Sequence, residues 1–382
     1  VDPLERVVPF EGDIYSDAAK QHIFAVTRRW LDPNGDGDPS DGVDGFRLDV
    51  AAEMPLGFWR EYRSFVRGIN PGAYLVGEVW WERFPDDLLD PEPFLRGDVF
   101  DGIMNYRWYR VARQFFADAP APMSPSAFVE RLESLAANLR TVSNRAMMNV
   151  TASHDTPRLS TSLFNKGKYK FEAKASENPE YKIHRPDAET YAVQRLLLAH
   201  QYTYIGAPHI WSGDEMGMWG SDDPHNRKPL IWPELQFDDE TEHPLGGRRP
   251  TDQVEFDTEL HGYYRKLIEV RESNPVLSHG ELEFLLADDD RDLLAYSRYD
   301  DEAEVIAVFN MSVAEHTFLA PAKTNRDYVD VLAGDTVARD ESALELTLPG
   351  RMAAILVALP KVSLTENDSG GSRTSRRATP RH

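Results

Sequence analysis

The chain has 382 residues, of which 41% are hydrophobic, and it carries a formal net charge of −22 and no cysteine. The negative charge argues against nucleic acid and anionic membranes as partners, because both require a basic surface. The lack of cysteine excludes disulfides, thiol catalysis and thiolate metal sites.

Residues 1–274 alternate between predicted strands and predicted helices. Helical spacing predicts a first helix over 18–30, with Ile23, Val26 and Trp30 on its apolar side. The strands are short and almost continuously apolar, which is typical of a parallel sheet covered by helices. In chain order we then predict a strand over 43–50, a helix over 57–69, strands over 73–80 and 98–106, helices over 108–118 and 125–140, a strand over 146–155, a helix over 188–202, a strand over 207–215 and a helix over 258–272.

The pattern changes after Asn274 and Pro275. Short alternating runs predict antiparallel strands, and hence a small antiparallel β-sandwich domain over 275–360. The runs are ELEFLLA, DLLAYSRY, EVIAVFNMS, HTFLA, ALELTLP and MAAILVAL. Residues 361–382 are polar, basic and rich in Gly and Ser, so we expect this tail to be disordered.

Three acidic residues stand at the ends of three predicted strands: Asp49, Glu78 and Asp155. In an α/β barrel, the carboxyl ends of the strands form the active site. Arg47 lies two residues before Asp49, hence on the same strand face, where its charge would hold the carboxylate ionised. Each acid alone is better explained as a helix cap, a solvated loop residue or half of a structural ion pair. Together they suit glycosidic bond cleavage, which needs one ionised and one protonated carboxyl group.

Several motifs resemble those of a known enzyme family. GFRLDVAAE (45–53), VGEVWW (76–81) and NVTASHDT (149–156) resemble, in order, three motifs of the α-amylase superfamily, glycoside hydrolase family thirteen. LDPNGDGDPSDGVDGFRLD (31–49) and SDDPHNRKPLIWPE (221–234) are most similar to the branch of neopullulanase, cyclomaltodextrinase and maltogenic amylase. The resemblance covers about residues 18–360.

The resemblance implies a (β/α)8 barrel of the TIM type and a role for each matching residue. Asp49 matches the nucleophile that forms a covalent glycosyl-enzyme, Glu78 the general acid/base, and Asp155 the aspartate that stabilises the transition state. Arg47 matches the arginine beside the nucleophile, and His154 a histidine that contacts the sugar. The implied mechanism is double displacement with retention, which places the two reacting carboxyl groups roughly 5–5.5 Å apart.

The implied substrates are α-1,4-glucosidic bonds in starch-derived glucans, cyclodextrins or pullulan, with transglycosylation as a second activity. No cofactor is required, and calcium is compatible with the family. A homodimer is compatible with the branch, although its dimers often use an N-terminal domain that we do not expect to find within these 382 residues.

Tryptophans near the motifs have two interpretations. Trp80 stands two residues after Glu78 and on the same face, where apolar packing would raise the pKa of the acid. Its ring is also a candidate for stacking on a sugar, and ordinary packing is the alternative. Ordinary packing is favoured for the other three: Trp81, Trp219 and Trp232.

Two further groups of polar residues lie in predicted loops. Asp223 and Arg227, in the last predicted loop of the barrel, match substrate-contacting positions of the branch. The loop DPNGDGDPSDG has the alternate spacing of a calcium loop, with candidate ligands Asp32, Asn34, Asp36 and Asp38. Its twelfth position is Val43 rather than a bidentate glutamate, so a solvated turn is the favoured interpretation.

The sequence departs from the family in length. We place about five strand–helix units in residues 1–274, whereas the barrel has eight. They match the last five, so we expect a partial catalytic domain whose N-terminal strands are missing. Because open sheet edges are liabilities, we expect the segment alone to be poorly soluble or inactive.

Two functions from other classes remain as alternatives. A non-catalytic amylase-like protein, acting as a binding or structural partner, would usually lack one of the three acids. A carbohydrate-binding module would not need so long an α/β pattern. The absence of cysteine leans towards a cytoplasmic location, but the N-terminus, which has no start methionine and no signal-peptide pattern, leaves the location undetermined.

Overall fold

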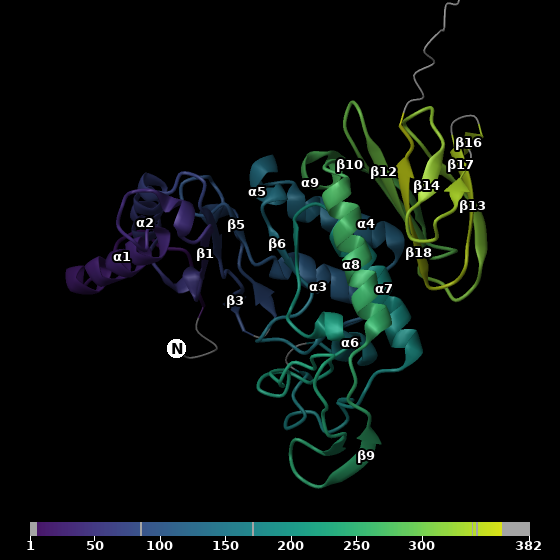
Figure 1. Cartoon of the computed structure of the whole chain (residues 1–382), viewed down its shortest axis with the longest axis horizontal. Coiled ribbons are helices and arrows are strands. Elements are labelled where there is room, and N and C mark those ends of the chain that lie inside the picture. Colours follow the sequence, from purple (N-terminus) through teal and green to yellow (C-terminus); the bar gives the residue numbers. More distant parts are fainter. Residues whose placement is uncertain (1–5, 85, 170–171, 338, 341–342, 361–382) are drawn as a thin grey trace, which may run out of the picture.

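The computed structural model describes all but a few stretches of the chain, and Figure 1 shows its arrangement. The described residues are 6–84, 86–169, 172–337, 339–340 and 343–360. The tail predicted to be disordered, 361–382, lies outside them. Among the described residues, no helix has both the length and the apolar character that crossing a membrane requires.

Five parallel strands follow the predicted order along the chain. β1 pairs with β2, and β2 with β5, while β6 pairs with β7. A single parallel bridge between Met104 and Met148 joins the two groups into one succession. The strands are β1 (Gly45–Leu48), β2 (Tyr74–Gly77), β5 (Gly102–Ile103), β6 (Met148–Val150) and β7 (Ala207–His209).

Each of these strands is shorter than the sequence predicts, because the polar residues at its end enter a turn or cap a helix. β1 ends at Leu48, and Val50 already adopts the left-handed backbone conformation. Asn105, which was predicted to lie in a strand, instead caps the next helix by accepting the N–H of Trp108. The shortening leaves the predicted site residues in loops at the carboxyl edge.

The α-helices connect and cover the parallel strands. Ser16, Asp187 and Asp257 begin three of them by accepting backbone N–H groups of the first turn. The helices are α1 (Asp17–Leu31), α2 (Leu56–Ile69), α3 (Tyr106–Ala117), α4 (Pro125–Ala136), α5 (Thr141–Arg145), α6 (Leu159–Phe164), α7 (Ala188–Thr203), α8 (Thr258–Ser273) and α9 (Val276–His279).

The buried face of α1 differs in part from the predicted one. Val26 and Trp30 are 44% and 57% exposed, whereas Phe24 and Leu31 are buried. The reason is the contact with α2, where the ring of Phe24 stacks on Phe65 with centroids 4.5 Å apart. This contact turns Phe24 inward and leaves Val26 and Trp30 outward, whereas Ile23, the third residue of the predicted apolar side, packs against the core as predicted.

The chain after α9 forms two antiparallel sheets, which agrees with the predicted small β domain. The larger sheet has the order β10-β11-β12-β18-β14-β15, and the smaller one β13-β17-β16. Leu293, Ile306, Phe318 and Leu344 pack between them. The strands are β10 (Glu281–Asp288), β11 (Leu293–Tyr299), β12 (Glu304–Asn310), β13 (His316–Pro321), β14 (Tyr328–Asp330), β15 (Thr336–Val337), β16 (Arg339–Asp340), β17 (Ala343–Leu348) and β18 (Met352–Ala358).

The other face of the larger sheet packs on the helices. Leu294, Tyr296 and Phe309 belong to the same buried cluster as Leu197 of α7. The hydroxyl of Tyr296 lies 2.6 Å from that of Thr203, at the end of α7. The hydrophobic core therefore continues across position 274/275. The division of the chain into two domains at this position stays a prediction.

Short elements in the loops were not predicted. Two hairpins extend from the carboxyl edge of the parallel strands, one of them in the lobe that carries β9 in Figure 1. They are β3 (Trp81–Arg83) with β4 (Asp87–Leu88), and β8 (Glu240–Glu242) with β9 (Arg248–Asp252). Single turns of 3-10 helix span Pro39–Asp41, Ala51–Glu53, Glu92–Phe94 and Asp214–Met216.

Candidate active site

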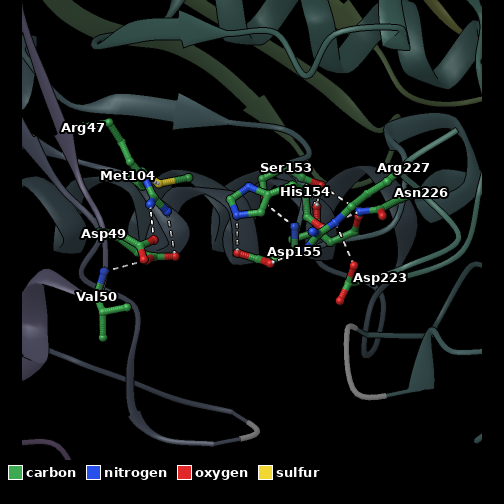
Figure 2. A network of polar contacts seen from close by, with 12 residues as sticks. Arg47, Asp49, Val50, Met104, Ser153, His154, Asp155, Asp223, Asn226 and Arg227 are labelled. Atoms are coloured by element: carbon green, nitrogen blue, oxygen red, sulfur yellow. Dashed lines mark hydrogen bonds and ion pairs between the residues drawn. The ribbon is translucent and has the colours of Figure 1, made fainter. Parts of the chain in front are cut away.

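The three predicted acids come together at the carboxyl edge of the parallel strands. Asp49 follows β1, Glu78 follows β2, and Asp155 lies in the loop after β6. Figure 2 shows Asp49 and Asp155 in two neighbouring groups of polar contacts. The charges of Asp49 and Asp155 both act on the pKa of Glu78, so the three form one electrostatic unit.

Arg47 binds both carboxylates of the first group. Its Nη1 pairs with Asp49, and its Nη2 lies 3.0 Å from Oε1 of Glu78. Its Nε contacts the sulfur of Met104 at 3.3 Å, which fixes the remaining side of the guanidinium group. The predicted geometry was wrong in one respect: Asp49 lies beyond the strand, and its side chain is 73% exposed.

The two carboxyl groups have pKa values shifted in opposite directions. The hydrogen bond from Arg47 lowers the pKa of Asp49, and the charge of Arg47 lowers it further, although partial burial opposes both effects. Burial raises the pKa of Glu78, and the charges of Asp49 and Asp155 add to this rise, although Arg47 opposes it. Asp49 therefore favours the ionised form, and Glu78 keeps its proton to higher pH than an ordinary glutamate.

Val50 is a residue of this site that the sequence did not reveal. Its φ of 49° lies in the left-handed region, which is strained for a β-branched residue. This conformation aims the Val50 N–H at Oε2 of Glu78, at 3.0 Å. No sequence signal marks a valine for such a position.

Trp80 packs on both of its faces. Its ring lies parallel to Tyr106 with centroids 3.6 Å apart, and nearly parallel to Trp81 at 4.5 Å. Two parallel rings this close must occupy opposite faces of Trp80, so a sugar could reach only its edge. Of the remaining tryptophans, Trp219 is buried and Trp232 is 47% exposed.

The second group of contacts holds Asp155 in place. Nε2 of His154 lies 3.1 Å from one carboxylate oxygen of Asp155, and Nη2 of Arg227 lies 3.3 Å from the other. Arg227 also pairs with Asp223 through Nε at 2.7 Å. The structure thus joins all four predicted residues of this group, as Figure 2 shows.

Asn226 is the second residue that sequence reasoning missed. It is fully buried, and its Nδ2 donates to the backbone carbonyls of Ser153, His154 and Thr156 at 3.1, 2.9 and 2.6 Å. These bonds tie the loop that carries Asp155 to the loop after β7. Its position beside Arg227 in the SDDPHNRKP motif was the available signal.

The candidate calcium loop uses its side-chain oxygens within the turn. Asp32, Asn34, Asp36 and Asp38 all accept backbone N–H groups of this exposed loop. Within the described part of the chain, no group of three or more His, Asp or Glu side chains is arranged to hold a metal ion. These hydrogen bonds are typical of Asx turns, and the choice between a solvated turn and a calcium loop stays a prediction.

Comparison with known proteins identifies the family to which the chain is similar. Residues 13–280 match the family described as alpha amylase, catalytic domain. A cyclomaltodextrinase of Geobacillus thermopakistaniensis is 32% identical over 332 residues, 86% of this chain and 46% of that protein. Neopullulanase 2 of Thermoactinomyces vulgaris is 30% identical over 344 residues, 88% of this chain and 48% of that protein.

A solved cyclomaltodextrinase structure aligns with a TM-score of 0.67 at 26% identity, over 92% of this chain and 53% of the other. The chain thus spans about half the length of the curated relatives it matches. Since the family match covers well over half of its residues, the chain belongs to the α-amylase family.

Proposed function

We propose that this chain carries the catalytic machinery of a retaining α-glucan hydrolase, with Asp49 as nucleophile and Glu78 as general acid/base. The observation that carries the proposal is the pair of opposite pKa shifts on two carboxyl groups bound to one arginine. Double displacement requires an ionised nucleophile and a protonated acid at the same pH.

In the first step, the Asp49 carboxylate attacks the anomeric carbon while Glu78 donates its proton to the leaving glycosidic oxygen. In the second step, Glu78 accepts a proton from water, and that water releases the sugar from Asp49. Asp155 and His154 would hold sugar hydroxyls, and Arg227 and Asp223 would extend the binding surface. An acceptor sugar in place of water would give transglycosylation.

The shared arginine of the two carboxyl groups supports retention. Inverting enzymes keep their carboxyl groups roughly 6.5–9.5 Å apart, so that a water molecule fits between substrate and base. Asp49 and Glu78 pair with neighbouring nitrogens of one guanidinium group, which holds them close together and favours the shorter separation of retaining enzymes.

We propose further that the five parallel strands are the last five of an eight-stranded barrel. Their order along the sheet follows their order along the chain, as in a barrel. The matched relatives, of which the chain spans about half, are named cyclomaltodextrinase and neopullulanase, and we extend cyclodextrins and pullulan to this chain as candidate substrates.

The experiment that tests the function is hydrolysis of β-cyclodextrin, pullulan and soluble starch, measured side by side. It uses the 382-residue chain and any longer natural form that contains it. Cleavage with the α-anomer as first product, seen by NMR, is the expected result. Binding without cleavage of any of the three glucans would favour the alternative, an amylase-like binding partner.

A further inference from the structure

A pocket of about 690 Å³ lies apart from the three acids. It is lined mainly by the segment Met218–Ile231, which follows β7, and by residues of the β8–β9 hairpin, and it is open to solvent. This volume falls within the roughly 300–1,000 Å³ of small-molecule sites. None of Asp49, Glu78 and Asp155 lines it.

The pocket wall has an apolar part and a charged part. Met218, Ile231, Phe237 and Val254 belong to one apolar cluster. The charged part centres on Glu240, whose carboxylate pairs with both Lys228 and Arg249. An apolar surface beside fixed hydrogen-bonding groups suits a sugar, which offers C–H faces and hydroxyls.

The charges of the wall argue against an anionic ligand and against a metal ion bound at Glu240. Asp238, Asp239, Glu240 and Glu242 outnumber Lys228 and Arg249 in the lining, which disfavours an anionic ligand. Glu240 is already neutralised by its two cations, so it is a poor site for another cation but a good acceptor for hydroxyl groups. Within the described residues no metal-binding group of His, Asp and Glu is found.

The pocket shares a wall with the candidate active site. Pro224, His225 and Lys228 line the pocket, whereas Asn226 and Arg227, from the same loop, contact the loop of Asp155. Figure 2 shows the active-site side of this loop. A ligand in the pocket would therefore contact the loop that positions Asp155.

We propose that this pocket is a second binding site for a neutral oligosaccharide, separate from the catalytic site. The choice of an α-glucan as its ligand rests on the proposed function. While one part of a glucan lies against Asp49 and Glu78, the pocket would hold either a further part of the same glucan molecule or a second glucan molecule.

Isothermal titration calorimetry with maltotriose tests the proposal, on the 382-residue chain carrying Glu78→Gln to prevent cleavage. Two binding events per chain are expected. Thr241→Trp, which fills the pocket from exposed strand β8, should remove one event. Thr336→Trp, on exposed strand β15, is the matched control and should retain both. Glu242→Trp, also in the pocket lining, repeats the test if Thr241→Trp fails to fold.

His154→Ala separates this proposal from the proposed function. If one event disappears with His154→Ala and none with the pocket substitutions, the pocket proposal is overturned and the catalytic site stands. If the only event disappears with the pocket substitutions alone, the pocket proposal holds and the catalytic assignment fails. Absence of any binding at millimolar maltotriose overturns both.

Discussion

Nη2 of Arg47 lies 3.0 Å from Oε1 of Glu78, a residue that follows the neighbouring strand. The same guanidinium group pairs with Asp49. Arg47 therefore stabilises the ionised form of both carboxyl groups, while burial acts on Glu78 in the opposite direction. Because both acids have the same cationic partner, the difference between them comes first from the burial of Glu78 and then from the charges of Asp49 and Asp155 beside it.

Removal of the Arg47 charge should shift the activity profile to higher pH. Arg47→Gln removes a cation that lowers the pKa of Asp49 and of Glu78, so both pKa values rise. The acidic limb of kcat/KM, which reports Asp49, and the basic limb, which reports Glu78, should both move upward. Arg107→Gln, outside the site, is the control. A lower maximum of kcat/KM, with both limbs at the same pH as in the unaltered protein, would contradict the assignment.

Glu78→Gln should lower activity according to the leaving group. A lost general acid costs about 10²–10⁴-fold in rate when the leaving group needs a proton, as in starch. An α-maltosyl fluoride needs no protonation, so its first step should be affected far less. Glu53→Gln, an exposed neighbour of the site, should leave both substrates unaffected. Equal losses on starch and on the fluoride would exclude Glu78 as the acid.

The side-chain amide N–H groups of Asn226 should be needed to hold the Asp155 loop in position. Asn226→Ala removes an amide group whose two N–H bonds are shared among three backbone carbonyls, a loss of about 0.5–1.5 kcal/mol per N–H, and loosens the Asp155 loop. Asn226→Asp would place an acceptor against those carbonyls and should be worse than alanine. The measurement is kcat together with the urea midpoint. If Asn226→Asp retains full kcat, the residue does not position Asp155.

Trp80 should behave as a packing residue. Because both faces of its ring are covered, Trp80→Ala should lower the free energy of unfolding by about 3–5 kcal/mol. Trp232→Ala, at an exposed position, should change it by less than about 0.5 kcal/mol. Thermal melts of the two variants decide the matter. Unchanged stability with a raised KM in Trp80→Ala would restore the sugar-stacking interpretation.

The sequence was sufficient for the features that local patterns determine. Strand–helix alternation predicted the parallel strands, and the three motifs predicted which acids stand at their ends. The opposite pKa directions of Asp49 and Glu78 also followed, from the adjacent arginine and the apolar surroundings.

Contacts between distant segments could not be predicted in this way. The buried face of α1 depends on Phe65 of α2, and the packing of Trp80 depends on Tyr106. The left-handed backbone of Val50 and the three bonds of Asn226 arise where loops meet. The spacing of residue types along the sequence does not show which distant segments will be in contact.

The identity of the nucleophile is tested most directly by trapping the covalent intermediate. The 382-residue chain, and any longer natural form that contains it, would be incubated with 5-fluoro-α-maltosyl fluoride, digested and analysed by mass spectrometry. The proposed mechanism predicts one added 5-fluoromaltosyl group, on the peptide that contains Asp49, and none in Asp49→Asn. Release of fluoride with the sugar bound to another residue, or with no adduct on any peptide, would contradict it.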